Sequence, residues 1–176
     1  MRMVRLITSI VFLFSTMQLF AQQYMANNGE ISFFSEAPLE DIKAINNKVS
    51  AVYDFDTKQL VFQLKIKDFI FPKALMQEHF NENYLESDLY PRSIFTGKVI
   101  SQSLENAIVE GELKIHGETN KIKVSGILKK GNNTVNISAK FIVKLEDYDV
   151  KIPTIVMYKI AEEIDVEVSI KLKEVK

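Results

Sequence analysis

Residues 48–67 read KVSAVYDFDTKQLVFQLKIK, and this stretch sets the class of fold. Apolar and polar side chains alternate on both sides of a short polar turn at residues 56–58. Strict alternation is typical of strands with one buried face, so the stretch predicts a β-hairpin. The side chains expected to face inward are Val49, Ala51, Tyr53 and Phe55 on the first strand and Leu60, Phe62, Leu64 and Ile66 on the second.

The same alternation continues outward from this hairpin along the chain. Residues 134–145 and 160–173 show it most plainly, and residues 30–35, 92–102, 107–116 and 119–129 add further strands, about eight in all. Residues 24–29 are expected to form a loose arm before the first strand. One buried and one wet face per strand favours antiparallel neighbours. The sequence therefore predicts an all-β, antiparallel fold, either a closed barrel of about eight strands or a two-sheet sandwich.

One segment departs from this pattern and predicts a single amphipathic helix near Pro72–Asn83. Pro72 suits a first helical turn, because its missing N–H is no loss there. Spacings of three and four then place five side chains on one face. We expect this face to cover one end of the barrel as a lid. Its members are Leu75, Met76, His79, Phe80 and Tyr84.

The amino-terminal residues have the layout of an export signal. Arg2 and Arg5 precede a mostly apolar run from Leu6 to Phe20, and a small residue, Ala21, follows it. The run is shorter than the ~20 residues that a membrane span needs. We expect residues 1–21 to be a cleaved signal peptide without a lasting transmembrane anchor, and residues 22–176 to be one domain. The expected location is the periplasm or the exterior of the cell.

The composition limits the functions that the chain can have. The formal net charge of -1 offers no attraction for nucleic acid, and the chain has no cysteine and two histidines, so no metal site or cofactor is expected. The acidic pairs Asp147/Asp149 and Glu162/Glu163 are the only hint of hydrolysis, and adjacent acids in loops are usually just solvated. His116 either caps a ligand or shapes the turn before Gly117, and the second role is favoured. The expected protein is not an enzyme.

Three segments resemble those of a known family. Residues 111–119, GELKIHGET, are similar to the "G-x-L-x-I-H-G-x-T" strand-turn-strand of the YceI-like family. Residues 85–95 resemble its "L-x-S-x-x-Y-P-x-x-x-F" segment, and Phe141 with residues 147–153 resembles its penultimate strand and loop. The amino-terminal half departs from the family, because residues 29–35, GEISFFS, replace the usual "H-S-x-I-x-F" opening. The resemblance covers about residues 30–173.

The resemblance implies a lipocalin-like barrel, usually exported, whose apolar interior holds a polyisoprenoid or a similar long lipid. Large apolar side chains gather in the lid and its neighbouring strands, where they either line a cavity or simply fill a core. The alternative to a lipid carrier is a packed barrel that acts as an interaction or structural module of the cell envelope. An apolar lipid or isoprenoid and a second copy of the chain, in a homodimer, are the partners considered. The candidate ligand-binding residues are Phe62, Leu64, Phe69, Phe71, Leu75, Met76, His79, Phe80, Tyr84 and Phe95.

Overall fold

The computed structural model describes residues 22–36, 41–103, 106–152 and 161–175. The expected signal peptide, residues 1–21, lies outside the described residues. The strands are β1 (Gln23–Ser35), β2 (Ile42–Asp54), β3 (Gln59–Lys65), β4 (Arg92–Gln102), β5 (Ala107–Ile115), β6 (Glu118–Lys130), β7 (Thr134–Lys144) and β8 (Glu163–Glu174). The helical segments are η1 (Ile66–Asp68), α1 (Ala74–His79), the π-helical η2 (Phe80–Tyr84) and η3 (Glu146–Tyr148).

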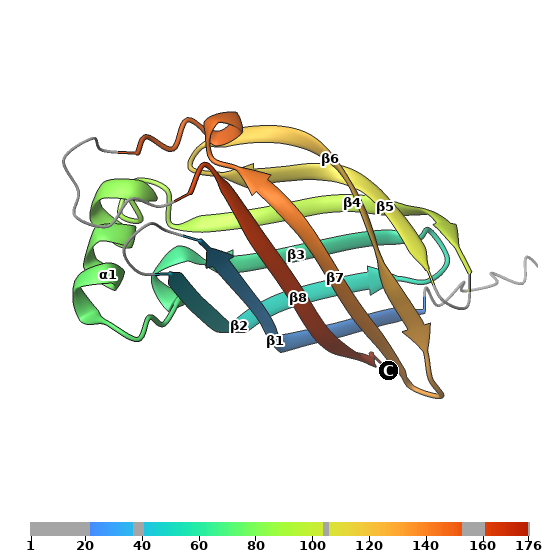
Figure 1. Ribbon diagram of the computed structural model, residues 1–176. Coiled ribbons are helices and arrows are strands. Elements are labelled where there is room, and N and C mark those ends of the chain that lie inside the picture. The colour runs from blue at the N-terminus through green and yellow to red at the C-terminus, as the bar shows by residue number, and fades with distance from the viewer. Residues whose placement is uncertain (1–21, 37–40, 104–105, 153–160, 176) are drawn as a thin grey trace, which may run out of the picture.

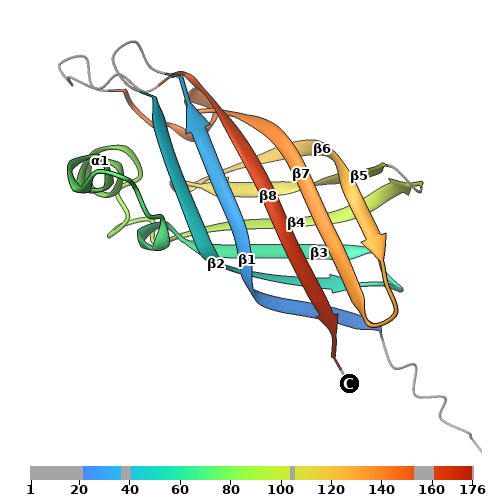
Figure 2. The same cartoon turned by 60° about the horizontal axis from the view of Figure 1, so that its bottom comes forward.

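The strands form a closed antiparallel barrel in which each strand pairs with its neighbours in chain order. Closure comes from β1, which pairs with β2 on one side and with β8 on the other. Figures 1 and 2 show the strands running obliquely around a common interior. The barrel predicted from the sequence is confirmed, and the two-sheet sandwich is wrong. A closed sheet has no free edge strand, so every strand obtains its backbone hydrogen bonds from the barrel itself.

The first strand is longer than the sequence indicated. Residues 24–29, expected to be a loose arm, belong to β1. Tyr24 and Met25 pair with both β2 and β8, and Ala26 and Gly29 pair with β2. Asn27, Asn28 and Gly29 favour loops on their own, but here they form a bulge between Ala26 and Ile31. A Cβ at Gly29 would lie 2.2 Å from the Ile170 side chain, so only glycine fits where the bent strand passes β8. The tertiary pairing therefore overrides the local preference.

The two ends of the barrel differ. One end carries η1, α1 and η2 between β3 and β4, and Figure 1 shows α1 standing beside this opening; we call it the lid end. The opposite end contains a tightly packed cluster around Tyr24, Tyr53, Leu172 and Val135, all fully buried. The barrel is thus filled by its own side chains at one end and covered by a helical segment at the other.

Inward and outward faces follow the predicted alternation. The sequence left the facing of residues 92–102 open between Phe95 with Val99 and Ile94 with Ile100. In the structure Val99 is buried and Phe95 packs against the core, whereas Ile100 is 49% exposed. A bulge between Val99 and Ser101 shifts the register with β5, and pairing then continues at Ser101 and Gln102. Phe95 therefore faces the interior, opposite Phe62 of β3.

Candidate functional site

The middle of the barrel contains an apolar cavity. Its volume is about 100 Å³. Phe62, Leu64 and Phe95 line it, together with side chains of β5, β6 and β7. We call this space the deep cavity. Because almost all of its wall is apolar, the groups that it can hold by burial are hydrocarbon.

A second apolar space, of about 130 Å³, lies toward the lid. Phe69, Phe80 and Leu85 line it on the lid side, and we call it the outer cavity. The two spaces lie end to end, because they share five wall residues: Ile31, Leu64, Ser93, Leu113 and Phe141. Together they form an apolar path from the lid into the middle of the barrel.

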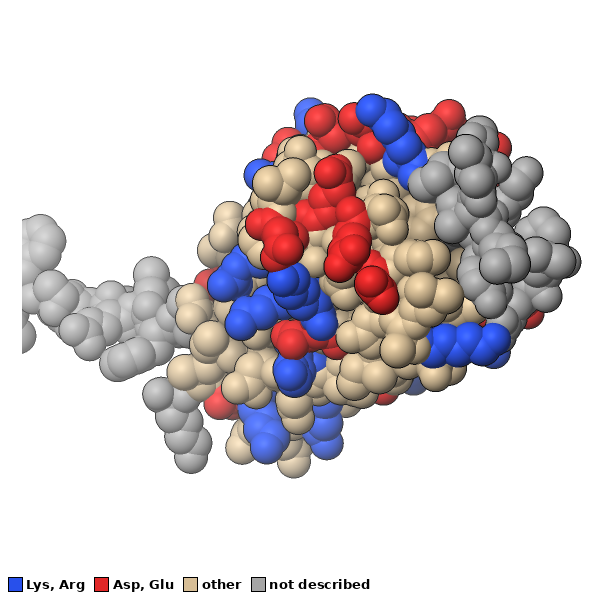
Figure 3. All heavy atoms as spheres, turned by 90° about the vertical axis from the view of Figure 1, so that its left-hand side faces the viewer, with Lys and Arg blue, Asp and Glu red and all other residues tan. Residues whose placement is uncertain are grey.

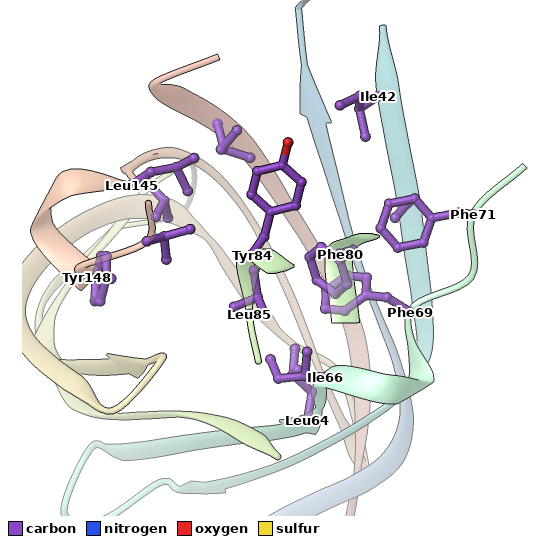
Figure 4. Packing of buried hydrophobic residues seen from close by; sticks show 14 of the residues in the cluster. Ile42, Leu64, Ile66, Phe69, Phe71, Phe80, Tyr84, Leu85, Leu145 and Tyr148 are labelled. Carbon is purple, nitrogen blue, oxygen red and sulfur yellow. The ribbon is translucent and has the colours of Figure 1, made fainter. Parts of the chain in front are cut away.

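Four phenylalanines join the lid to the barrel wall. The ring of Phe80 on η2 lies 4.9 Å from that of Phe71 and 5.5 Å from those of Phe69 and Phe33, centroid to centroid. Figure 4 shows Phe80 next to Phe69 and Phe71, with Tyr84 and Leu85 on the other side of Phe80. Such ring pairs add about 0.5–1.5 kcal/mol each beyond simple burial. Phe80 is therefore the central contact that holds the lid over the outer cavity.

Glycines make room inside the barrel where β4 and β5 meet. Gly97 and Gly111 are register partners, and the Phe95 ring lies against both. A Cβ at Gly111 would come within 2.5 Å of the Gly97 backbone and 2.7 Å of the Phe95 ring. A larger side chain at either position would force the strands apart or push Phe95 into the deep cavity.

A sequence comparison decides the family. The model of the YceI-like domain matches residues 23–172. The chain belongs to the YceI-like family. No curated protein matches the chain in sequence.

Solved structures share the fold of this YceI-like barrel at low identity. BcnA of Burkholderia cenocepacia has a TM-score of 0.71 and 14% identity, over 82% of this chain and 95% of that one. A polyisoprenoid binding domain from Saccharophagus degradans, implicated in plant cell wall breakdown, has a TM-score of 0.74 and 10% identity, over 88% and 99%. The Campylobacter jejuni YceI protein has a TM-score of 0.66 and 20% identity, over 80% and 89%. These likenesses concern the fold.

The structure separates the candidate ligand-binding residues into three groups. Phe62, Leu64, Phe69, Phe80 and Phe95 line the two cavities of the YceI-like barrel. Phe71, Met76 and Tyr84 are buried beside the outer cavity but do not line it.

Leu75 and His79 lie outside this wall. Leu75 is 49% exposed, so the expectation that it faces the core is wrong, and His79 is half-buried. The α-helix is too short to place all five predicted side chains on one face. Between β3 and β4 only residues 74–79 are α-helical, and the π-helical turn that follows places Tyr84 and Leu85 side by side in the core.

Several wall residues were missed by sequence reasoning, which looked mainly at aromatic residues near the lid. The alternation in residues 134–145 and 160–173 had already placed the missed positions of β7 and β8 on the inner face, and that signal could have identified them. The missed wall residues of the outer cavity are Ile31, Phe33, Ile66, Leu85, Ser93, Leu113, Ile115, Phe141, Val143, Leu145, Tyr148, Val150, Ile164 and Val166.

His116 makes longer-range contacts than the sequence suggested. It forms the β5–β6 turn with Gly117, and both residues have positive φ, 50° and 87°. Its Nδ1 lies 3.1 Å from the Tyr148 carbonyl oxygen and its Nε2 2.8 Å from Glu86 Oε2. The ring therefore bonds backbone, as expected, but backbone of a different loop.

The acidic pairs lie on the surface. Asp147, Asp149, Glu162 and Glu163 are all exposed, and Glu163 pairs with Lys144 at 3.4 Å. Within residues 22–36, 41–103, 106–152 and 161–175, no three His, Asp or Glu side chains gather as a metal site would require. In the same ranges, no helix has the length and apolar character needed to cross a bilayer.

Charge is mixed over the lid end. Figure 3 looks onto this face and shows acidic and basic side chains in separate groups beside uncharged surface. Some opposite charges pair directly, as Lys67 does with Asp88 and Lys48 does with Asp68. The visible face thus lacks the single-sign field that attracts polyanions over a distance.

Proposed function

We propose that this protein is an exported, non-catalytic carrier that holds one long apolar chain inside its barrel. The observation that carries the proposal is the apolar path formed by the outer and deep cavities. Wall residues from every strand except β2 line this path, so most of a bound chain would lie against apolar side chains. Proteins bind such chains by removing them from water rather than by specific polar contacts.

The arrangement of two adjoining cavities, one behind the other, favours a long, slender ligand over a broad one. The path continues from the lid past Leu64 and Leu113 to Leu60 and Leu128 in the middle of the barrel. Flat ring systems need width, whereas an isoprenoid or acyl chain needs length. Each buried CH₂ contributes about 0.8 kcal/mol, so a chain that occupies both cavities is held tightly without any ion pair.

The family supports the same ligand class. A structural neighbour from Saccharophagus degradans is described as a polyisoprenoid binding domain, and its fold is shared over most of both chains. We infer that this chain takes an isoprenoid or similar lipid, entering at the lid end where Phe80 and Leu85 border the outer cavity. Residues 1–21 would direct it out of the cytoplasm and then be removed.

The direct test is to look for the ligand. Purified protein is extracted with organic solvent, the extract is analysed by mass spectrometry, and delipidated protein is titrated with a neutral fluorescent prenyl alcohol. We expect a co-purified chain lipid and saturable uptake of one probe per barrel. An empty extract together with no uptake would reject the carrier function.

A matched pair of variants ties uptake to the cavity. Phe80→Asp places a charge in the wall of the outer cavity, and we expect uptake to be lost. Ile100→Asp makes the same change of charge on the outside of β4, where the side chain is 49% exposed, and uptake should persist. Equal loss in both variants would show that the change in charge alone impairs binding.

A further inference from the structure

His116 connects three separate loops at the lid end. Its own turn joins β5 to β6, the Glu86 carboxylate belongs to the segment that follows η2, and the Tyr148 carbonyl belongs to η3. The imidazole is nearly buried, with 8% of its side chain exposed, and the Tyr90 ring covers it at 4.5 Å, centroid to centroid. One side chain thus fastens the lid segment to the rim of the barrel.

The three loops also form the border of the outer cavity. Leu85 precedes Glu86, Ile115 precedes His116, and Leu85, Ile115 and Tyr148 all line that cavity. The segment after Glu86 is held by its own backbone, because the Glu86 carbonyl accepts bonds from the Leu89 and Tyr90 amides. Loss of the imidazole contact would therefore free the turn at residues 86–90 from the rim as a unit rather than unravel it, and loosen the lid that Phe80 still anchors.

The contact geometry requires a proton. Tyr148 offers a carbonyl oxygen, which only accepts, so Nδ1 must carry hydrogen. Nε2 faces a carboxylate oxygen at 2.8 Å, and two lone pairs at that distance repel. A favourable contact therefore needs a second proton, which makes the ring an imidazolium paired with the Glu86 carboxylate.

The other groups that contact the His116 ring do not accept a proton from Nε2, so Glu86 is the partner of that proton. Tyr90 meets the ring through its aromatic face, and Tyr148 meets it through backbone. The Tyr148 phenol stays neutral, because burial and then the nearby Asp147 raise its pKa. Asp147 on η3 and Glu118 on β6 are exposed acids on the adjoining segments.

We propose that His116 and Glu86 form a proton-dependent latch that holds the lid closed and controls ligand release. Acid conditions fasten the latch by completing the imidazolium–carboxylate pair, and rising pH removes the shared proton and loosens the lid. The latch itself rests on contacts within the chain. Its effect on ligand release rests on the proposed lipid-carrier function.

Release kinetics test the functional consequence. Protein loaded with a neutral fluorescent prenyl alcohol is mixed with excess acceptor vesicles at about pH 5.5 and about pH 8, on either side of the range in which histidine changes charge. We expect wild-type release to be about tenfold faster at the higher pH, since a charge-assisted hydrogen bond is lost. A rate independent of pH would overturn the latch.

Glu86→Gln is the decisive variant. Its amide can donate to a neutral Nε2 and accept from a protonated one, so release should be slow at both pH values. His116→Asn keeps a residue that tolerates positive φ but removes the bridge, so release should be fast at both. Glu82→Gln makes the same charge change at an exposed site of η2 and should behave as wild type. Wild-type pH dependence in Glu86→Gln would also overturn the latch.

A second measurement separates the latch from the carrier function. Amide hydrogen exchange of ligand-free protein gives protection factors for residues 80–90, corrected for intrinsic exchange at each pH. We expect protection there to fall from about pH 5.5 to about pH 8 in wild type but not in Glu86→Gln. If no probe binds, the carrier function fails while this result still decides the latch. Equal protection at both pH values in wild type would reject it.

Discussion

Tyr53 carries a polar atom in one of the most apolar places in the molecule. Its side chain is fully buried at the end of the barrel opposite the lid, and its hydroxyl has no hydrogen-bond partner among the described residues. The same holds for Tyr24, its register partner on β1. A buried hydroxyl without a partner costs about 1–3 kcal/mol in lost hydration. The two rings therefore stabilise this end by their size, and their hydroxyl groups oppose it.

Tyr53→Phe should accordingly stabilise the protein. The ring remains and the unpaired hydroxyl is removed, so we expect the free energy of unfolding to rise by about 1 kcal/mol. Urea denaturation followed by circular dichroism measures the change. Tyr90→Phe, at a half-buried position near the surface, is the control and should change the stability less. A clear loss of stability in Tyr53→Phe would mean that the hydroxyl has a partner in solution.

The buried tyrosines also predict how stability depends on alkaline pH. Burial, followed by the charge of Asp54, raises the pKa of Tyr53, and burial raises those of Tyr84 and Tyr148. In the unfolded chain these phenols lose their protons near pH ~10, whereas in the folded protein they keep them to higher pH. Their contribution to stability is therefore complete below that value and declines above it.

Urea denaturation at about pH 8 and about pH 11 checks the sign of this pH dependence, because the second value lies above the ordinary range of tyrosine pKa values. The free energy of unfolding should be lower at the higher pH, and Tyr53→Phe should lose less of it than wild type. An equal loss in the two proteins would show that Tyr53 ionises as easily in the fold as in the unfolded chain.

The lid is the element whose details depart most from the sequence pattern. Leu75 and Met76 are neighbours in α1 and similar in size, yet Leu75 is 49% exposed and Met76 only 7%. We expect Met76→Ala to lower the free energy of unfolding by about 2–4 kcal/mol, since it removes buried atoms from the cluster around Phe80. Leu75→Ala should change it by less than about 0.5 kcal/mol. Urea denaturation of both variants checks this, and similar losses would place Leu75 in the core.

Strands were easier to predict than the helical segment, for a physical reason. A strand with one wet face repeats every two residues, and no other structure mimics that period over ten residues. The inward orientation of Leu113, Ile137 and Ile164 was therefore predicted correctly from their strands. A helix that changes from α to π after His79 has no single period, so five residues cannot be assigned to one face from spacing alone.

Local sequence patterns also gave wrong predictions where pairing with distant strands determines the backbone conformation. Residues 27–29, Asn-Asn-Gly, are typical of a loop, and only the presence of β2 and β8 on both sides makes them part of a strand. His116 illustrates the same limit in the candidate site. Its turn could be predicted from the following glycine, but Glu86 and Tyr148 lie 30 and 32 residues away, and their approach depends on closure of the barrel.

At the scale of the whole molecule, whether the barrel is hollow was beyond the sequence. Alternation shows which side chains face inward but not whether their volumes fill the interior. The structure answers this through particular positions: Gly97, Gly111 and Gly126 contribute little volume to the inner wall, while Tyr24 and Tyr53 fill the end opposite the lid. The space therefore lies in the middle and toward the lid.

A change at the junction of the two cavities tests whether they act as one binding site. Leu113 lines both spaces and is 8% exposed. Leu113→Trp should narrow the path there while leaving the outer cavity open. Because each buried CH₂ contributes about 0.8 kcal/mol, a long chain that loses the deep cavity should bind more than about tenfold more weakly. A short chain that needs only the outer cavity should bind nearly as before.

Titrations with geranylgeraniol and geraniol, the long and the short prenyl alcohol, measure the two effects. Ile142→Trp adds the same ring on the outside of β7, where the side chain is 58% exposed, and should leave both affinities unchanged. Unfolding curves of Leu113→Trp show whether overpacking has damaged the barrel, which would weaken both alcohols together. If the folded variant binds both alcohols as wild type does, the ligand does not pass Leu113, and the deep cavity takes no part in binding.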